Sequence, residues 1–119
     1  MTLQEREAHA CAIIDSMAEE LRDVSLYLHD NPELGLNEHK AVKVINQFLE
    51  NHNFTSQVGL TDLPELQTAL RGDYNGTAQN KIAFLGEYDA LPELGHGCGH
   101  NLIAMMSLGA AVAFSQSAP

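Results

Sequence analysis

A short glycine-rich segment, GHGCGHN at residues 95–101, holds the side chains of this sequence that are best suited to chemistry. His96, Cys98 and His100 occupy every second position in it, with glycine between them. Thiolate and imidazole are good ligands for Zn²⁺, and they also accept Ni²⁺, Co²⁺ or Mn²⁺. The segment could equally hold a reactive thiol or be a loop without chemistry, so its interpretation depends on the residues around it.

Two carboxylates precede this segment, at the end of the apolar run KIAFLG. Glu87 and Asp89 stand two positions apart, so in an extended chain their side chains project to the same side. Ligands of α/β proteins bind beyond the carboxyl ends of the strands. Carboxylates at this place can complete the ligand set of a metal or orient an imidazole that binds it.

Together these residues predict a site for a divalent metal, most simply zinc. Cys98 and His100 are the expected ligands, because side chains at i and i+2 of an irregular loop can point the same way. The loop also leads into a helix, whose N-terminus favours the thiolate form of a cysteine. Three further side chains are expected either to bind the metal or to support its ligands: Glu87, His96 and Asn101.

The N-terminal part of the chain shows helical periodicity. Between residues 3 and 29, apolar side chains recur alternately three and four positions apart, which predicts one helix with a stripe at Ile14, Met17, Leu21, Val24 and Leu28. Pro32 and Gly35 interrupt this pattern. We expect Asn37 to cap a second helix that ends near residues 51–53.

The periodicity then changes to that of strands, at residues 54–58, 66–72 and 81–91. Asn75 and Gly76 predict a hairpin-type connection between the last two. KIAFLG is nearly all apolar, as expected for a strand buried on both faces. Residues 101–116 lack a polar face and predict a helix buried on most sides. The order indicates an α/β fold with a small mixed sheet and its site in the loop after the buried strand.

Composition narrows the function further. The chain has 119 residues, 45% of them hydrophobic, which suits one small domain. Its formal net charge of −10 argues against nucleic acid or an anionic membrane as a partner. The start of the sequence is too charged for a signal peptide, and the apolar run from Leu102 to Phe114 is too short to span a bilayer. These features predict a soluble cytoplasmic protein.

Two longer stretches resemble a known family. LHDNPELGLNEHKAVKVINQFLE and GEYDALPELGHGCGHNLIA are similar to the start of the zinc-type amidohydrolases of the aminoacylase/carboxypeptidase metallopeptidase family. The Glu-Tyr-Asp and Cys-Gly-His-Asn versions of these motifs resemble the branch of p-aminobenzoyl-glutamate hydrolases and acylase-like dipeptidases. Relatives that cleave N-acyl amino acids commonly have Asp where this chain has Asn101.

The resemblance implies roles for individual residues. Cys98 and His100 match metal ligands, with Cys98 at the position of the group that bridges two metals, and Asp89 matches a catalytic acid that supports a metal-bound ligand. In the family a metal-bound water attacks an amide carbonyl, with a Glu as general base. The implied substrates are N-acyl or aminobenzoyl amino acids or dipeptides, and a homo-oligomer is a possible assembly.

The chain differs from the family in its length. Family catalytic domains are far longer and carry an inserted smaller domain, whereas residues 102–119 contain no Asp, Glu, His or Cys. We interpret residues 1–119 as an N-terminal fragment of the catalytic domain that is inactive alone. One alternative is a truncated, catalytically inactive binding protein. Another is a redox protein that uses Cys98, although its only companion, Cys11, falls in a remote helix.

Overall fold

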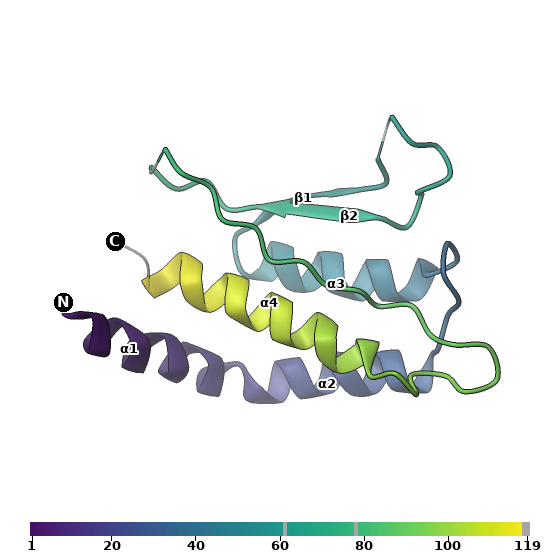
Figure 1. Ribbon diagram of the computed structural model, residues 1–119, viewed down its shortest axis with the longest axis horizontal. Helices are drawn as coiled ribbons and strands as arrows, with labels where there is room; N and C mark the ends of the chain where they lie inside the picture. The colour runs from purple at the N-terminus through teal and green to yellow at the C-terminus, as the bar shows by residue number, and fades with distance from the viewer. Residues whose placement is uncertain (61, 78, 118–119) are drawn as a thin grey trace.

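The computed structural model describes residues 1–60, 62–77 and 79–117. Their elements are α1 (Leu3–Ser16), α2 (Ala18–Asp30), α3 (His39–Asn51), β1 (Thr55–Val58), β2 (Leu70–Asp73) and α4 (His100–Ser117). In Figure 1, α1 and α2 follow one another along one side of the molecule, α4 lies beside them, and the two strands lie over α3. This combination of helices and strands confirms the predicted α/β class.

The predicted first helix is two helices. The chain breaks at Met17, which ends α1 and precedes α2 with φ −100° and ψ 4°. Met17 itself is buried, and its N–H donates to the Ile14 carbonyl at 3.0 Å. The break changes which side of α1 faces the core, so Ile13 is buried and Ile14 is exposed. The predicted stripe was therefore correct in α2, at Val24 and Leu28, and wrong at Ile14.

The core lies where the helices meet. Its most deeply buried side chains come from three of them: Leu28 of α2, Phe48 of α3 and Val112 of α4. The other side of α4 carries exposed apolar side chains, with Leu102 at 59% and Met106 at 72% exposure. The prediction that this helix is buried on most sides is therefore wrong, because within the described residues only α1 and α2 pack extensively against it.

The sheet has two antiparallel strands in the described residues, with Thr55 paired to Asp73 and Val58 to Leu70. The prediction of a strand at 54–58 is confirmed, and that at 66–72 is confirmed in its second half. α3 packs under both strands so closely that a Cβ on Gly72 would lie 2.9 Å from Leu49 Cδ1. The observed sheet is smaller than the predicted one and is antiparallel rather than mixed.

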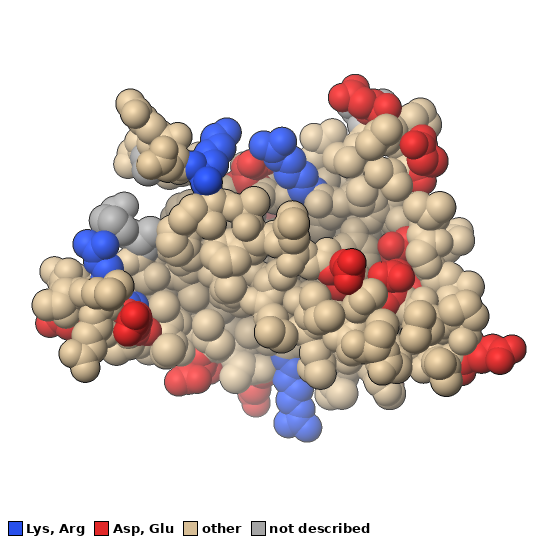
Figure 2. Space-filling model, viewed as in Figure 1, with Lys and Arg blue, Asp and Glu red and all other residues tan. Residues whose placement is uncertain are grey.

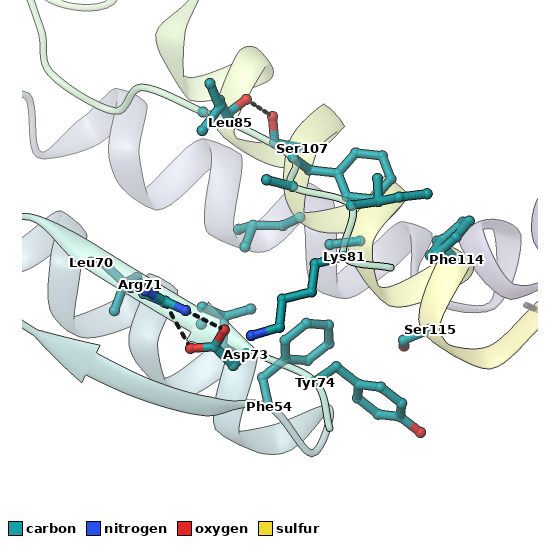
Figure 3. A pocket seen from close by; sticks show the side chains of 18 of the residues that line it. Phe54, Leu70, Arg71, Asp73, Tyr74, Lys81, Leu85, Ser107, Phe114 and Ser115 are labelled. Carbon is teal, nitrogen blue, oxygen red and sulfur yellow. Dashed lines mark hydrogen bonds and ion pairs between the residues drawn. The ribbon is translucent and has the colours of Figure 1, made fainter. Parts of the chain in front are cut away.

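The predicted buried strand 81–91 is the main error. Residues 81–89 are not in a strand, and Ala90 forms only an isolated parallel bridge to Leu34. Ile82 and Leu85 are 63% and 87% exposed. An open groove of about 1170 Å³ separates residues 81–86 from β2, so the predicted hairpin partner is not within pairing distance. In Figure 3 the Lys81 side chain points across this groove toward Asp73.

The surface reflects the same arrangement. Figure 2 shows that uncharged side chains cover most of the face on which α4 and the extended segment lie.

At the sheet, Arg71 Nε donates to Asp73 Oδ2 at 2.9 Å, and this hydrogen bond lowers the pKa of the Asp73 carboxyl group. Across the described ranges, none of the helices has both the length and the hydrophobicity that crossing a bilayer requires.

Candidate functional site

His100, the first residue of α4, lies between the two predicted carboxylates. Its Nδ1 is 2.8 Å from Asp89 Oδ1 and 3.1 Å from the Asp89 carbonyl oxygen, and its Nε2 is 3.0 Å from Glu87 Oε2. A carboxylate only accepts hydrogen bonds, so the contact with Asp89 requires a hydrogen on Nδ1. The structure thus brings together three of the predicted site residues, with Nδ1 of His100 facing Asp89 and Nε2 facing Glu87.

The loop before α4 is shaped by its glycines. The backbones of Leu91 and Gly95 exchange two hydrogen bonds, of 2.8 and 3.1 Å, which closes a tight turn at residues 91–95. Gly99 has φ 83°, a conformation that favours glycine, and its carbonyl accepts from the first turn of α4. Cys98, two positions before His100 in this loop, is exposed and carries a free thiol.

His96 lies behind the loop in an unusual environment. Both of its ring nitrogens are removed from solvent, and neither has a hydrogen-bond partner among the described residues. Burial, followed by repulsion from His100 and His29, lowers the pKa of the His96 imidazole. This environment disfavours the charged form of the His96 imidazole, and buried polar groups of this kind in proteins normally have a partner.

Asn101 fixes the start of α4 on α2. The residue is buried, and its Nδ2 donates to the Ser25 hydroxyl at 3.1 Å and to the Ser25 carbonyl at 3.4 Å. The two residues are far apart in the sequence, so this contact sets the position of the helix that carries His100. Its amide nitrogen is used in packing, and the predicted part of Asn101 in binding or supporting a metal stays a prediction.

The connection between α2 and α3 also reaches the site. The carboxylate of Glu33 accepts from the backbone N–H groups of Lys40, at 2.9 and 3.0 Å, and of Ala41, at 2.8 Å. Asn37 does not cap α3 as predicted, because the helix begins one residue later, after Glu38, and Glu33 satisfies its free amides from a distance. The backbone carbonyl of Glu33 accepts from the Ala90 N–H at 2.7 Å. Sequence reasoning missed Glu33 as a contributor to the site, and its only signal was the motif His-x-x-Pro-Glu-Leu.

A small hollow of about 270 Å³ opens beside the site, lined in part by Glu87, Asp89, Glu38 and Thr68. Tyr88 forms part of its wall, and its hydroxyl donates to the Thr68 carbonyl. Burial, together with the nearby Glu38 carboxylate, raises the pKa of Tyr88 to about 12. The hollow therefore combines carboxylates with a neutral phenol, and it is distinct from the larger groove beside β2.

The donor atoms of this region fit a divalent metal in kind. His100 is held by a carboxylate in the way that proteins orient metal-binding imidazoles, and the buried nitrogens of His96 lack partners among the described residues. His100, Asp89 and Glu87 contact one another, but within the described ranges no three His, Cys, Asp or Glu side chains are arranged as a group that could hold an ion. The structure thus presents part of a ligand set.

Comparison with known proteins gives a partial match. No family model matches the chain. Its relatives, however, are named as hydrolases of dipeptides and of p-aminobenzoyl-glutamate, and they support the amidohydrolase and peptidase family as a partial match for this chain.

The individual relatives are these. The chain is 38% identical over 105 residues to a Xaa-Arg dipeptidase of Mus musculus and 35% identical over 108 residues to that of Homo sapiens, in both cases over 83% of its own length. It is 29% identical to one of the subunits of the p-aminobenzoyl-glutamate hydrolase of Escherichia coli over 84% of its length. The chain spans about a quarter of the length of these relatives, since the matches cover 24%, 25% and 24% of them.

Proposed function

We propose that this chain supplies part of the active site of a metal-dependent amidohydrolase or peptidase. The proposed substrates are dipeptides or amino acids with an N-acyl or aminobenzoyl group. The observation that carries the proposal is the placement of His100, whose Nδ1 is 2.8 Å from Asp89 while its Nε2 is directed to the Glu87 carboxylate. The names of the relatives support the same class of reaction.

Each residue has a proposed task. Cys98 and His100 bind the metal, and Glu87, whose Oε2 is 3.0 Å from Nε2, is the next candidate donor. Asp89 accepts the hydrogen of Nδ1, which fixes the tautomer and the orientation of the ring and increases the basicity of Nε2. When bound, a metal such as zinc would polarise the amide carbonyl and acidify a water molecule.

The proposal also concerns what the 119 residues do alone. Within the described ranges no three His, Cys, Asp or Glu side chains are arranged to hold an ion, and a stable protein site for zinc normally has three or four ligands. We therefore propose that the chain by itself binds zinc weakly and does not hydrolyse N-acyl amino acids or p-aminobenzoyl-glutamate at a measurable rate. Groups that complete the site would come from further polypeptide or from a second copy.

Zinc titration by calorimetry tests this proposal. Replacing a ligand, as in Cys98→Ser or His100→Ala, should weaken zinc binding by about tenfold or more, since even residues that only support ligands contribute about 10- to 100-fold. Cys11→Ser is the matched control, because Cys11 is also an exposed free thiol but lies in α1. Equal affinities for wild type, Cys98→Ser and His100→Ala would exclude both residues as ligands and overturn the proposal.

A second measurement tests inactivity. The purified chain is incubated with each substrate and excess Zn²⁺ or Mn²⁺, and no turnover is expected, because the positioned base and full ligand set that such hydrolysis requires are not assembled. Metal-dependent turnover that Cys98→Ala or His100→Ala abolishes would contradict this expectation, and it would indicate that an oligomer of this chain completes the site.

A further inference from the structure

The connection between α2 and α3 contacts the site loop at three successive points. Pro32 packs on Gly95, where an added Cβ would lie 3.8 Å from Pro32 Cβ. Glu33 accepts the Ala90 N–H through its carbonyl at 2.7 Å, and Leu34 forms the parallel bridge with Ala90. Two of these contacts are made by Ala90, the residue next to Asp89, which holds His100.

One further contact brings the connection against Asp89 itself. A Cβ on Gly35 would lie 3.9 Å from Asp89 Oδ2, so the backbone of the connection borders the carboxylate whose other oxygen, Oδ1, accepts from His100. The position of residues 32–35 therefore limits where the Asp89 carboxylate can lie. What fixes the connection in turn fixes the Asp89–His100 pair.

The connection is fastened by the Glu33 side chain. Its carboxylate binds two backbone amides at the N-terminus of α3, Lys40 N and Ala41 N, at 2.8 to 3.0 Å. The Ala41 side of this contact is partly buried, and the negative charge also interacts favourably with the N-terminal end of the helix dipole. α3 is itself anchored in the core by buried side chains, which makes it a rigid support.

We infer that Glu33 is a positioning residue for the candidate site: by binding the N-terminus of α3, it holds Ala90 and Asp89 where Asp89 can orient His100. The hydrogen bonds of Glu33 in the described ranges go to the backbone of Lys40, Ala41 and Ala90. The inference rests on the proposed function in one respect only, namely that the Asp89–His100 pair serves a metal site. The pair itself, and the path from α3 through Glu33 to Ala90, are geometric.

The test measures the pair directly, in the purified chain without metal. Two signals are followed by NMR: the exchange rate of the Ala90 amide hydrogen and the resonance of the His100 Nδ1 hydrogen. Glu33→Ala should accelerate Ala90 exchange by about tenfold, the size expected for the loss of a helix-capping contact, and should remove or broaden the His100 signal. Glu33→Gln keeps an oxygen that can accept from both amides, so the Ala90 exchange rate and the His100 signal should be those of the wild type.

Glu5→Ala is the matched control. Glu5 also binds backbone at a helix N-terminus, through the capping box with Thr2 in α1, and it lies away from the site loop. It should change neither signal. If Glu33→Ala does not fold, Glu33→Asp takes its place, because it keeps the charge and shortens the reach by one methylene group.

The outcomes are separable from those of the proposed function. Unchanged Ala90 exchange and an unchanged His100 signal in the Glu33 variants would overturn the inference, whatever the zinc titration gives. Faster Ala90 exchange together with a lost or broadened His100 signal in Glu5→Ala would overturn it as well, since the effect would then be general to helix caps. If the Glu33 variants change both signals as expected while zinc affinity is equal for wild type, Cys98→Ser and His100→Ala, the positioning role is supported and the metal site is rejected.

Discussion

Residues 81–86 expose Ile82 and Leu85, whereas residues 89–101, which follow almost at once, are held by contacts with α2 and with the connection between α2 and α3. The first segment is the more apolar and has no paired neighbour in the described ranges. The second is rich in glycine and polar residues, yet Ala90 is bound to Glu33 and Asn101 to Ser25.

The difference shows that hydrophobicity alone does not place a segment in the core. A strand is buried only when other strands accept its backbone hydrogen bonds and other layers cover its faces. A loop with special backbone conformations and a few well-placed acceptors can be fixed by single hydrogen bonds from several elements. The candidate site is fixed in this second way, so it does not depend on the sheet around residues 81–86.

The largest expected effect separates the core from the exposed segment. Leu28→Ala should lower the free energy of unfolding by about 3 kcal/mol, because Leu28 is only 1% exposed and its removal leaves a cavity. Leu85→Ala, the same change at a side chain that is 87% exposed, should stay within about 0.5 kcal/mol. Urea unfolding followed by circular dichroism gives both values. A loss at Leu85 as large as that at Leu28 would show that residues 81–86 are packed in solution.

A smaller effect is expected where the loop joins α4. Asn101→Ala removes the hydrogen bonds to Ser25 from a buried position and should destabilise the chain by about 1 to 3 kcal/mol. Asn80→Ala, next to the exposed segment, is the control and should be close to neutral. The same unfolding measurement applies. Comparable values for the two variants would contradict the view that residues 89–101 are the anchored half.

The smallest effect concerns pH and Tyr88, which stands between the two segments. Folding raises the pKa of Tyr88 from 10.0 to about 12, so the folded chain holds this proton more tightly than the unfolded chain. The resulting stabilisation is complete below pH 10 and is lost as the pH rises through about 12. Tyr88→Phe should make stability less dependent on pH in this window, as unfolding at several pH values would reveal. An identical pH dependence in both proteins would show that Tyr88 is solvated.

The sequence predicted those features that depend on local pattern. The helix periodicity of Val24 and Leu28 and the strand at 54–58 were sufficient for α2 and β1. Asp89, Glu87 and His100 were all among the predicted site residues, and the structure brings them together at 2.8 and 3.0 Å. The metal and the ligand role of Cys98 remain predictions.

The errors came from contacts between distant parts of the chain. No local signal shows that Met17 breaks the first helix, because the break follows from packing against the core. KIAFLG would be buried only if other strands paired with it, and no strand of the described ranges does. Glu33 was overlooked because its partners are not its neighbours in the sequence. The amides that it binds at α3 are 7 and 8 positions away, and Ala90 is much farther.

The exposed segment also determines how the chain would respond to a protease. Trypsin cleaves after Lys or Arg, and it needs backbone in an extended, accessible form. Five of the six such residues lie in helices or in β2: Arg6, Arg22, Lys40, Lys43 and Arg71. Lys81 stands instead in an exposed stretch that is unpaired within the described ranges. The first cut should therefore fall after Lys81, and it would divide the chain into one fragment with Glu33 and another with Asp89, Cys98 and His100.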